Sequence, residues 1–111
     1  MVKLIWMLKK KSGLTTEQFL QYWYEKHAPL VLKVVPGINR YIQNHAVKLA
    51  GGKEPQFDGI VETWFDDLET WLKSRDWYLS DEGKVIREDE EKFIDMSKSV
   101  FMITEERVIK P

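Results

Sequence analysis

Residues 15–39 read TTEQFLQYWYEKHAPLVLKVVPGIN and decide the fold of this chain. Thr15 and Gln18 have the spacing of a capping box, in which each side chain satisfies a free backbone N–H at the start of a helix. Large apolar and aromatic residues then recur at helical spacing, at Leu20, Trp23, Tyr24 and His27. We therefore expect one face of this helix to be aromatic and to pack on a sheet.

Pro29 sets the end of this first helix. A proline disfavours the helical conformation of the residue before it, so the helix is expected to break near His27, just ahead of Ala28. Pro29 itself suits the first position of a second helical piece, which we expect at residues 30–35. The Pro-Gly pair that follows stops this piece.

The rest of the chain supplies strands and a second helical region. Asp66 and Glu69 repeat the capping-box spacing and open a helix, and residues 77–95 predict a charge-rich helical region interrupted at Gly83. A loop at 50–58, with two glycines and a proline, joins the two middle strands of a long hairpin. The four expected strands cover residues 2–8, 38–49, 59–65 and 100–108.

This β-α-β-β-α-β order is the split arrangement of ferredoxin-like folds. It predicts one α+β domain over residues 1–111, with a four-stranded antiparallel sheet and both helical regions on one of its faces. The other face is left uncovered, so it must be polar, face a ligand or meet a second sheet. We therefore expect the functional side chains on this uncovered face.

The composition of the chain limits the classes of partner that we expect it to bind. The chain has 17 Lys and Arg against 18 Asp and Glu, and the two signs are interspersed, so no long-range field steers it to nucleic acid or to a membrane. The absence of cysteine excludes disulfides and thiolate chemistry and fits a cytoplasmic protein, and the apolar start is too short for a targeting or membrane segment. With 43% hydrophobic residues and five Trp, the chain has more apolar surface than a small domain usually hides, so we expect self-association in which a second subunit buries part of this surface.

The candidate site lies on the middle hairpin. If the hairpin closes midway through its loop, His45 lies opposite Glu62 and shares a face with Tyr41, Gln43 and Trp64. This mixture of aromatic walls and polar groups is typical of a small-molecule pocket, to which Trp6 adds a further wall. The carboxylate would orient the imidazole, which makes His45 a candidate general acid or base. The alternative is a solvated cross-strand ion pair with no chemical role.

His27 is the second candidate for catalysis. Its alternative role is structural, because an imidazole at a helix end interacts with the last carbonyl groups and with the helix dipole. The sequence has no Gly-rich phosphate loop, no nucleophile elbow and no His/Cys spacing for zinc, so we expect neither a cofactor nor a metal. The acidic run at 89–91 is interpreted as a solvated helix face.

Several motifs together resemble the EthD family of the dimeric α/β-barrel superfamily. They are LTTEQFLQYWYEKHAPLV at 14–31, VPGINRYIQNH at 35–45, ETWFDDLE at 62–69 and DEEKFID at 89–95. The resemblance implies a ferredoxin-like protomer whose sheet packs on that of a second subunit and closes a barrel around a ligand cavity. It also matches His27 to the histidine of the family's His-x-Pro motif and His45 to a histidine that commonly closes the second-strand motif.

The resemblance leaves several functions open, because members of the superfamily include cyclases, decarboxylases, dehydratases, isomerases and cofactor-free monooxygenases. The first hypothesis is a cofactor-independent lyase, isomerase or cyclase that acts on a small aromatic, lactone or polyketide-like acid by His acid-base chemistry. The second is a non-catalytic accessory or metabolite-binding protein of a catabolic pathway. A cofactor-free monooxygenase and a dimer with a filled barrel are further alternatives.

Overall fold

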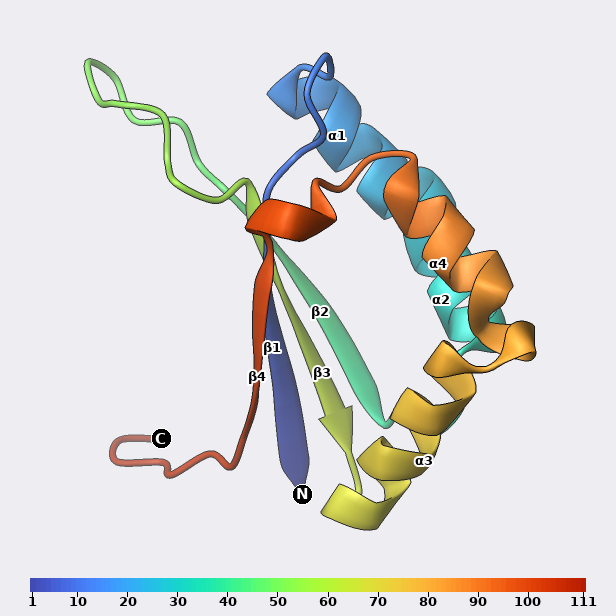
Figure 1. Ribbon diagram of the computed structural model, residues 1–111. Coiled ribbons are helices and arrows are strands. Elements are labelled where there is room, and N and C mark those ends of the chain that lie inside the picture. The colour runs from blue at the N-terminus through green and yellow to red at the C-terminus, as the bar shows by residue number, and fades with distance from the viewer.

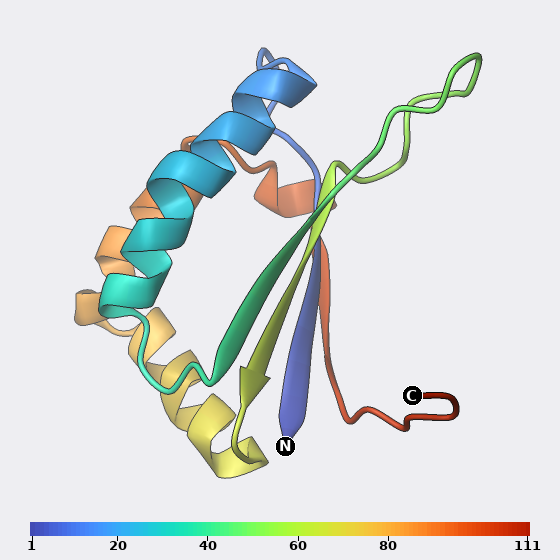
Figure 2. The same cartoon turned by 180° about the vertical axis from the view of Figure 1, so that it is seen from behind.

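The computed structural model describes all of residues 1–111 and confirms the ferredoxin-like fold. Its four strands form one antiparallel sheet in the order β2-β3-β1-β4. All the helices lie on one face of this sheet and leave the other face open (Figures 1 and 2). The strands are β1 Val2–Leu8, β2 Arg40–His45, β3 Gly59–Phe65 and β4 Val100–Thr104, so the second and fourth are shorter than expected.

The first helical layer begins as the sequence predicts. Thr15 caps the helix, and both reciprocal hydrogen bonds of the capping box with Gln18 are present, at 3.1 and 2.9 Å. The layer consists of α1 Thr16–Tyr22, the π-helical turn η1 Trp23–His27 and α2 Ala28–Val34.

The break expected near His27 takes the form of a π-helical turn, and the chain stays helical through it. Ala28 has helical φ and ψ of −57° and −47°, and its N–H bonds to the carbonyl of Trp23, five residues earlier. Pro29 has no N–H to offer the preceding turn, so the regular α-helical ladder cannot continue. The wider turn absorbs this defect and keeps His27 buried on the sheet side.

The helices that follow β3 have other bounds than the sequence predicts. Its first helix runs on through Trp77, and the residue that caps it is Asp67, whose carboxylate accepts from the N–H of Thr70 at 2.7 Å. The interruption predicted at Gly83 is present. The elements are α3 Leu68–Leu79, the 3-10 turn η2 Asp81–Gly83, α4 Lys84–Glu91 and the 3-10 turn η3 Met96–Lys98.

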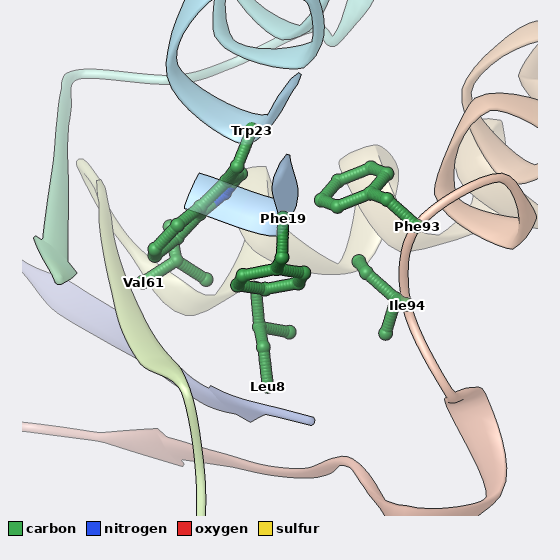
Figure 3. Close-up of a cluster of buried hydrophobic side chains, with 6 residues drawn as sticks. All are labelled: Leu8, Phe19, Trp23, Val61, Phe93 and Ile94. Carbon is green, nitrogen blue, oxygen red and sulfur yellow. The ribbon is translucent and has the colours of Figure 1, made fainter. Parts of the chain in front are cut away.

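The core joins the sheet to the first helix and to the end of α4. Figure 3 shows the six side chains of this cluster, among which Phe19 and Trp23 project from α1 and η1 towards the sheet. The rings of Phe19 and Phe93 lie 5.5 Å apart. Burial of these large apolar side chains holds the helices on the sheet. The cluster consists of Leu8, Phe19, Trp23, Val61, Phe93 and Ile94.

The register of the middle hairpin is not the expected one. His45 lies opposite Gly59, and Glu62 lies opposite Ile42 and Ile5. Because successive side chains of a strand alternate between the faces of a sheet, this register places His45 and Glu62 on opposite faces. The predicted His45–Glu62 pair is therefore wrong.

Asp58 contacts the chain on both sides of the start of β3, and just beyond the end of β2 its backbone carbonyl accepts from the N–H of Ala46 at 3.1 Å. Its carboxylate is buried and accepts from the N–H of Lys10 at 2.7 Å, while its own N–H bonds to the carbonyl of Leu8 at 2.8 Å. The start of β3 is thus fixed against the end of β1. Residues 46–57 form no strand and project as an arm from the body of the protein (Figures 1 and 2). The apolar residues of this arm made the second strand look longer in the sequence than it is.

Candidate functional site between the sheet and the helices

A cavity of about 470 Å³ lies between the sheet and the helices. This volume suits a small organic molecule. Of the 23 residues that line it, 17 are hydrophobic, and three Trp residues, at positions 6, 23 and 71, are among them. The remaining six lining residues are polar or charged, and two of the hydrophobic ones, Tyr41 and Tyr78, also carry a hydroxyl group. The six are His27, Thr63, Ser74, Arg75, Glu90 and Ser99. The candidate site therefore lies on the helix-covered face, whereas the sequence analysis placed it on the uncovered face.

His27 is held in the cavity wall by a buried carboxylate. Its Nδ1 lies 2.7 Å from Oδ2 of Asp89, and both residues are buried. The other oxygen of Asp89 accepts from the hydroxyl of Tyr22 at 2.5 Å, and Phe93 packs on the imidazole with the ring centres 4.8 Å apart. The ring of His27 is thus fixed by two neighbours on α4 and its C-terminal extension.

The protonation state of this pair follows from its surroundings. Burial lowers the pKa of His27, although the hydrogen bond to Asp89 opposes this shift. Burial raises the pKa of Asp89, but the hydrogen bonds from Tyr22 and His27 outweigh it, so the pKa stays below its usual value. We therefore assign a neutral imidazole that donates its Nδ1–H to an ionised carboxylate. Nε2 of His27 makes no hydrogen bond within the protein. No side-chain nitrogen or oxygen atom is both fully buried and without a partner, so Nε2 is accessible and its lone pair is available to the cavity.

Glu90 is a second ionisable group in the same wall. It is only 4% exposed, and one of its oxygens accepts from the hydroxyl of Tyr78 at 2.5 Å. Burial raises the pKa of Glu90 to about 7. The cavity thus holds an imidazole with a lowered pKa and a carboxyl group with a raised one, a combination that serves proton transfer at neutral pH.

The structure separates the predicted site residues into two groups. Tyr41 and Trp6 line the cavity, and Gln43 and His45 lie on the same face of β2 as Tyr41. His45 is exposed and lies outside the cavity, where it stacks on Trp23 with the ring centres 5.0 Å apart.

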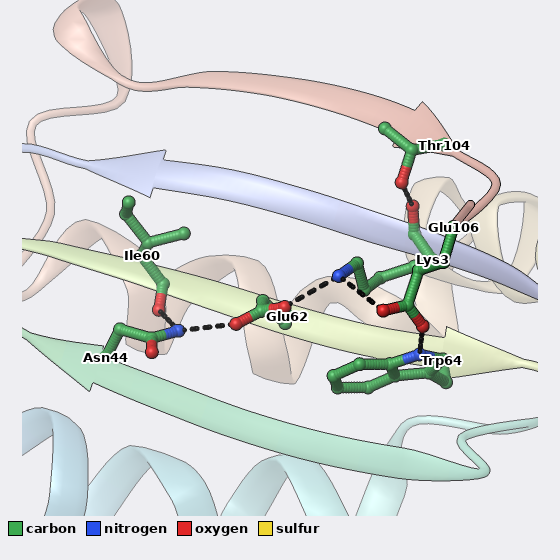
Figure 4. Close-up of polar contacts among 7 residues, drawn as sticks. All are labelled: Lys3, Asn44, Ile60, Glu62, Trp64, Thr104 and Glu106. Atoms are coloured by element: carbon green, nitrogen blue, oxygen red, sulfur yellow. Dashed lines mark hydrogen bonds and ion pairs between the residues drawn. The ribbon is translucent and has the colours of Figure 1, made fainter. Parts of the chain in front are cut away.

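Glu62 and Trp64 lie on the opposite, helix-free face, so neither contacts the cavity. Figure 4 shows their network, in which Glu62 pairs with Lys3 at 2.8 Å and the indole N–H of Trp64 donates to Glu106 at 2.7 Å. Asn44 also donates to Glu62, at 2.9 Å. Glu62 is therefore occupied by partners of its own and cannot orient His45.

Asp89 and Glu90 were missed by sequence reasoning. The interpretation of residues 89–91 as a solvated face is wrong for the first two, which are buried, and holds for Glu91, which is exposed. The available signal was the DExxFxD pattern itself. Its Asp89 binds His27, its Glu90 faces the cavity, and its Phe93 packs on the imidazole. Nothing local in the sequence indicates that Asp89 points inward, because its partners Tyr22 and His27 lie more than 60 positions away. Glu90 bonds to Tyr78, which belongs to the preceding helix.

No group of three or more His, Cys, Asp or Glu side chains is arranged to hold a metal ion. No helix has both the length and the apolar composition to cross a lipid bilayer.

Comparisons with known proteins place the chain among proteins of the same fold. The model of the EthD domain matches residues 11–97. An EthD family protein from Bacillus halodurans is 30% identical, with a TM-score of 0.72 over 96% of this chain and 99% of that chain. None of the curated proteins matches.

Two more distant structures share the fold. A hydroxynitrile lyase from Passiflora edulis is 14% identical, with a TM-score of 0.68 over 99% of this chain and 96% of that one. A dimeric protein of ferredoxin-like fold from Bacteroides fragilis is 12% identical, with a TM-score of 0.62 over 95% of each chain. At these identities the likeness concerns the fold alone.

Proposed function

The chain belongs to the EthD family, and from the geometry of its cavity we propose that it is a cofactor-independent lyase or isomerase in which His27 transfers protons. The ligand is a small, largely apolar compound such as an aromatic, lactone or polyketide-like acid. The enzyme in the Passiflora edulis comparison is a lyase on the same fold, which makes the fold compatible with this chemistry but does not choose the reaction.

One observation carries the proposal. His27 directs Nδ1 to Asp89 at 2.7 Å and keeps Nε2 free in the wall of a largely apolar cavity. A neutral imidazole in this state is a general base, and the carboxylate behind it stabilises the imidazolium that forms when it accepts a proton. This arrangement replaces the role that the sequence analysis gave to His45 and Glu62.

Glu90 supplies the complementary group. Its pKa is about 7, so at neutral pH a substantial fraction of Glu90 is protonated. Only one carboxyl oxygen of Glu90 bonds to the hydroxyl of Tyr78, so the other oxygen is free to contact a ligand. We assign it the role of the general acid that returns a proton to the ligand or to the leaving group.

The lining defines the ligand class. Most of it is apolar and aromatic, so burial of apolar ligand surface supplies most of the affinity. The single cationic lining residue, Arg75, has a half-exposed side chain that also contacts Asp76 at 3.3 Å. An acidic group of the ligand is therefore accommodated near Arg75, and the apolar body lies deeper, against the tryptophans.

The test combines binding with product analysis. The purified protein is titrated with aromatic acids, lactones and β-keto acids while Trp fluorescence is followed, because three tryptophans line the cavity. Each ligand is then recovered for mass analysis. His27→Gln should bind a ligand that the unaltered protein converts, but its turnover should fall by about 100-fold or more. The matched control is Lys26→Gln, an exposed neighbour on the same turn, which should keep full turnover. Full turnover by His27→Gln would contradict the proposal.

The second candidate function is ligand binding without catalysis. It is favoured by the predominance of apolar lining, which needs no chemistry to sequester a hydrophobic metabolite. Saturable quenching by a ligand that is always recovered unchanged would establish this function. Oxygen uptake on ligand addition would instead indicate a cofactor-free monooxygenase.

A further inference from the structure

A chain of hydrogen bonds runs along β2 from the protein surface to the cavity wall. It starts at His45, whose Nε2 lies 2.8 Å from the side-chain oxygen of Gln43. The amide nitrogen of Gln43 lies 3.3 Å from the hydroxyl of Tyr41. The three residues alternate along one strand, so their side chains share the helix-facing side of the sheet. Tyr41 is the member that lines the cavity.

The direction of this chain is fixed at its centre. The Gln43 amide nitrogen also donates to the backbone carbonyl of Trp23 at 3.0 Å. A carbonyl oxygen can only accept, so this end of the amide is the NH₂ group and the other end is the acceptor. His45 therefore donates to Gln43, and Gln43 donates to the oxygen of Tyr41.

The π-helical turn supplies the anchor for Gln43. The Trp23 carbonyl accepts both the Gln43 amide and the N–H of Ala28. The indole of Trp23 stacks on His45, with an angle of 24° between the planes, and Tyr24 meets the same imidazole edge-on. His45 is thus held in one orientation although it is exposed to solvent.

This chain of hydrogen bonds ends at the hydroxyl group of Tyr41. Its oxygen accepts from Gln43, and its own O–H makes no hydrogen bond to an acceptor within the protein. Tyr41 is one of the residues that line the cavity. Burial raises the pKa of Tyr41, against hydrogen bonds from Gln43 and Trp23 that lower it, so the group remains a phenol. A neutral, oriented O–H on the wall of an apolar cavity is a donor for a ligand oxygen.

We propose that Tyr41 is the oxyanion-binding donor of the cavity, with Gln43 and His45 as the positioning residues that turn its O–H towards the ligand. The inference rests on the proposed function and names its substrate class, a compound with a carbonyl group next to the carbon that is deprotonated. His27 Nε2 takes the proton from that carbon, the C–H electron pair forms a C=C bond, and the carbonyl π pair moves to the oxygen. Tyr41 hydrogen-bonds the enolate oxygen, and the proton returns to carbon from His27 or from Glu90. No oxidant or reductant is needed.

The test uses 4-nitrophenol, whose phenolate mimics an enolate oxygen and absorbs visible light, together with nitrobenzene, which has the same ring without that oxygen. Tyr41→Phe should weaken binding of the phenolate by about tenfold or more and reduce the fraction of bound 4-nitrophenol that is ionised. It should leave nitrobenzene binding unchanged, because the aromatic wall is kept. Equal phenolate binding by Tyr41→Phe would overturn the proposal.

Two variants of His45 test the positioning role. His45→Phe keeps the stacking on Trp23 but removes the donor, so phenolate affinity should fall by about threefold to tenfold. His45→Gln keeps an N–H donor and should restore most of this loss. The control is Asn44→Ala, on the same strand with its side chain on the opposite face, which should bind both probes like the unaltered protein.

The outcomes distinguish a failure of the proposed function from a failure of the oxyanion role of Tyr41. If the unaltered protein binds neither probe, the cavity of the proposed function fails and the oxyanion role fails with it. If nitrobenzene binds and the phenolate gains nothing from Tyr41, the cavity stands and the oxyanion role is overturned. If Tyr41→Phe has the expected effect but His45→Phe has none, the assignment of His45 as a positioning residue is overturned.

Discussion

Nδ1 of His27 lies 2.7 Å from Oδ2 of Asp89, although the two residues are 62 positions apart. The contact joins the π-helical turn to α4, at the position where His27 lines the cavity. It also explains why a His-x-Pro motif and a DExxFxD motif occur together in this chain. Pro29 forces the turn that carries the histidine, and the acidic motif supplies its partner and its packing.

Asp89→Asn should change the tautomer and the basicity of the His27 imidazole while the ring itself stays in place. An amide cannot stabilise the imidazolium as a carboxylate does, so turnover should fall by about 100-fold or more, and unfolding should become easier by about 1.5–3 kcal/mol. The ¹⁵N chemical shifts of the imidazole should show a changed tautomer population. The matched control is Tyr22→Phe, which removes only the second hydrogen bond to Asp89. If Asp89→Asn left both the tautomer and turnover unchanged, the orienting role of the carboxylate would be refuted.

Glu90→Gln tests the buried carboxyl through the pH dependence of stability. The pKa of Glu90 rises from 4.5 to about 7 on folding. Below about 4.5 both states are protonated, and between 4.5 and 7 only the unfolded state loses the proton, so stability falls as the pH rises and levels off above 7. This loss amounts to about 3 kcal/mol. Glu90→Gln removes the group that titrates, so it should match the unaltered protein at pH 4 and exceed its stability at pH 8 by about that amount.

The measurement is denaturant unfolding at a series of pH values, with the exposed Glu88→Gln as the control that keeps the unaltered pH profile. An identical pH profile for Glu90→Gln and the unaltered protein would show that Glu90 ionises normally in the folded state.

Gly59→Ala should destabilise the core. A Cβ built at Gly59 would lie 2.4 Å from the ring of Trp23 and 3.1 Å from the carbonyl of Asn44, and neither neighbour can move freely because Trp23 is buried and Asn44 belongs to a strand. The expected cost in the free energy of unfolding is about 1–3 kcal/mol, measured by thermal or denaturant unfolding. Gly52→Ala, in the exposed arm, is the control and should change stability by less than about 0.5 kcal/mol. A neutral Gly59→Ala would show that the glycine is not required by this close approach.

Met102→Lys tests the proposed homodimer. The open face of the sheet carries exposed apolar side chains, among them Ile60, Val100 and Met102, and we propose that a second copy packs on it. A buried, unpaired ammonium group at Met102 would prevent that packing, so the variant should sediment as a monomer at concentrations where the unaltered protein is a dimer. Leu32→Lys, at an equally exposed position on α2, should leave the assembly unchanged. A dimer that survives Met102→Lys would place the interface elsewhere.

The sequence by itself determined the order of the elements and the start of the first helix. These features are local: the capping box at Thr15, the alternation of apolar residues in the strands, and the turn residues between them act over a few positions. The resemblance to the EthD family and the prominence of His27 were likewise readable from the motif around Pro29.

Only the tertiary structure decided the pairing of the middle hairpin and the face on which the site lies. A shift of register by an odd number of residues turns one strand's side chains to the opposite face. Here the start of β3 is held by Asp58, whose carboxylate contacts the chain 48 positions away and whose carbonyl accepts from the N–H of Ala46. The same holds for Asp89 and Glu90, which look like solvated acids on a charged helix until α4 packs against the first helical layer. Local pattern fixes which elements form, whereas the chemistry of the site depends on which of their faces meet, and that is settled by contacts between residues far apart in the chain.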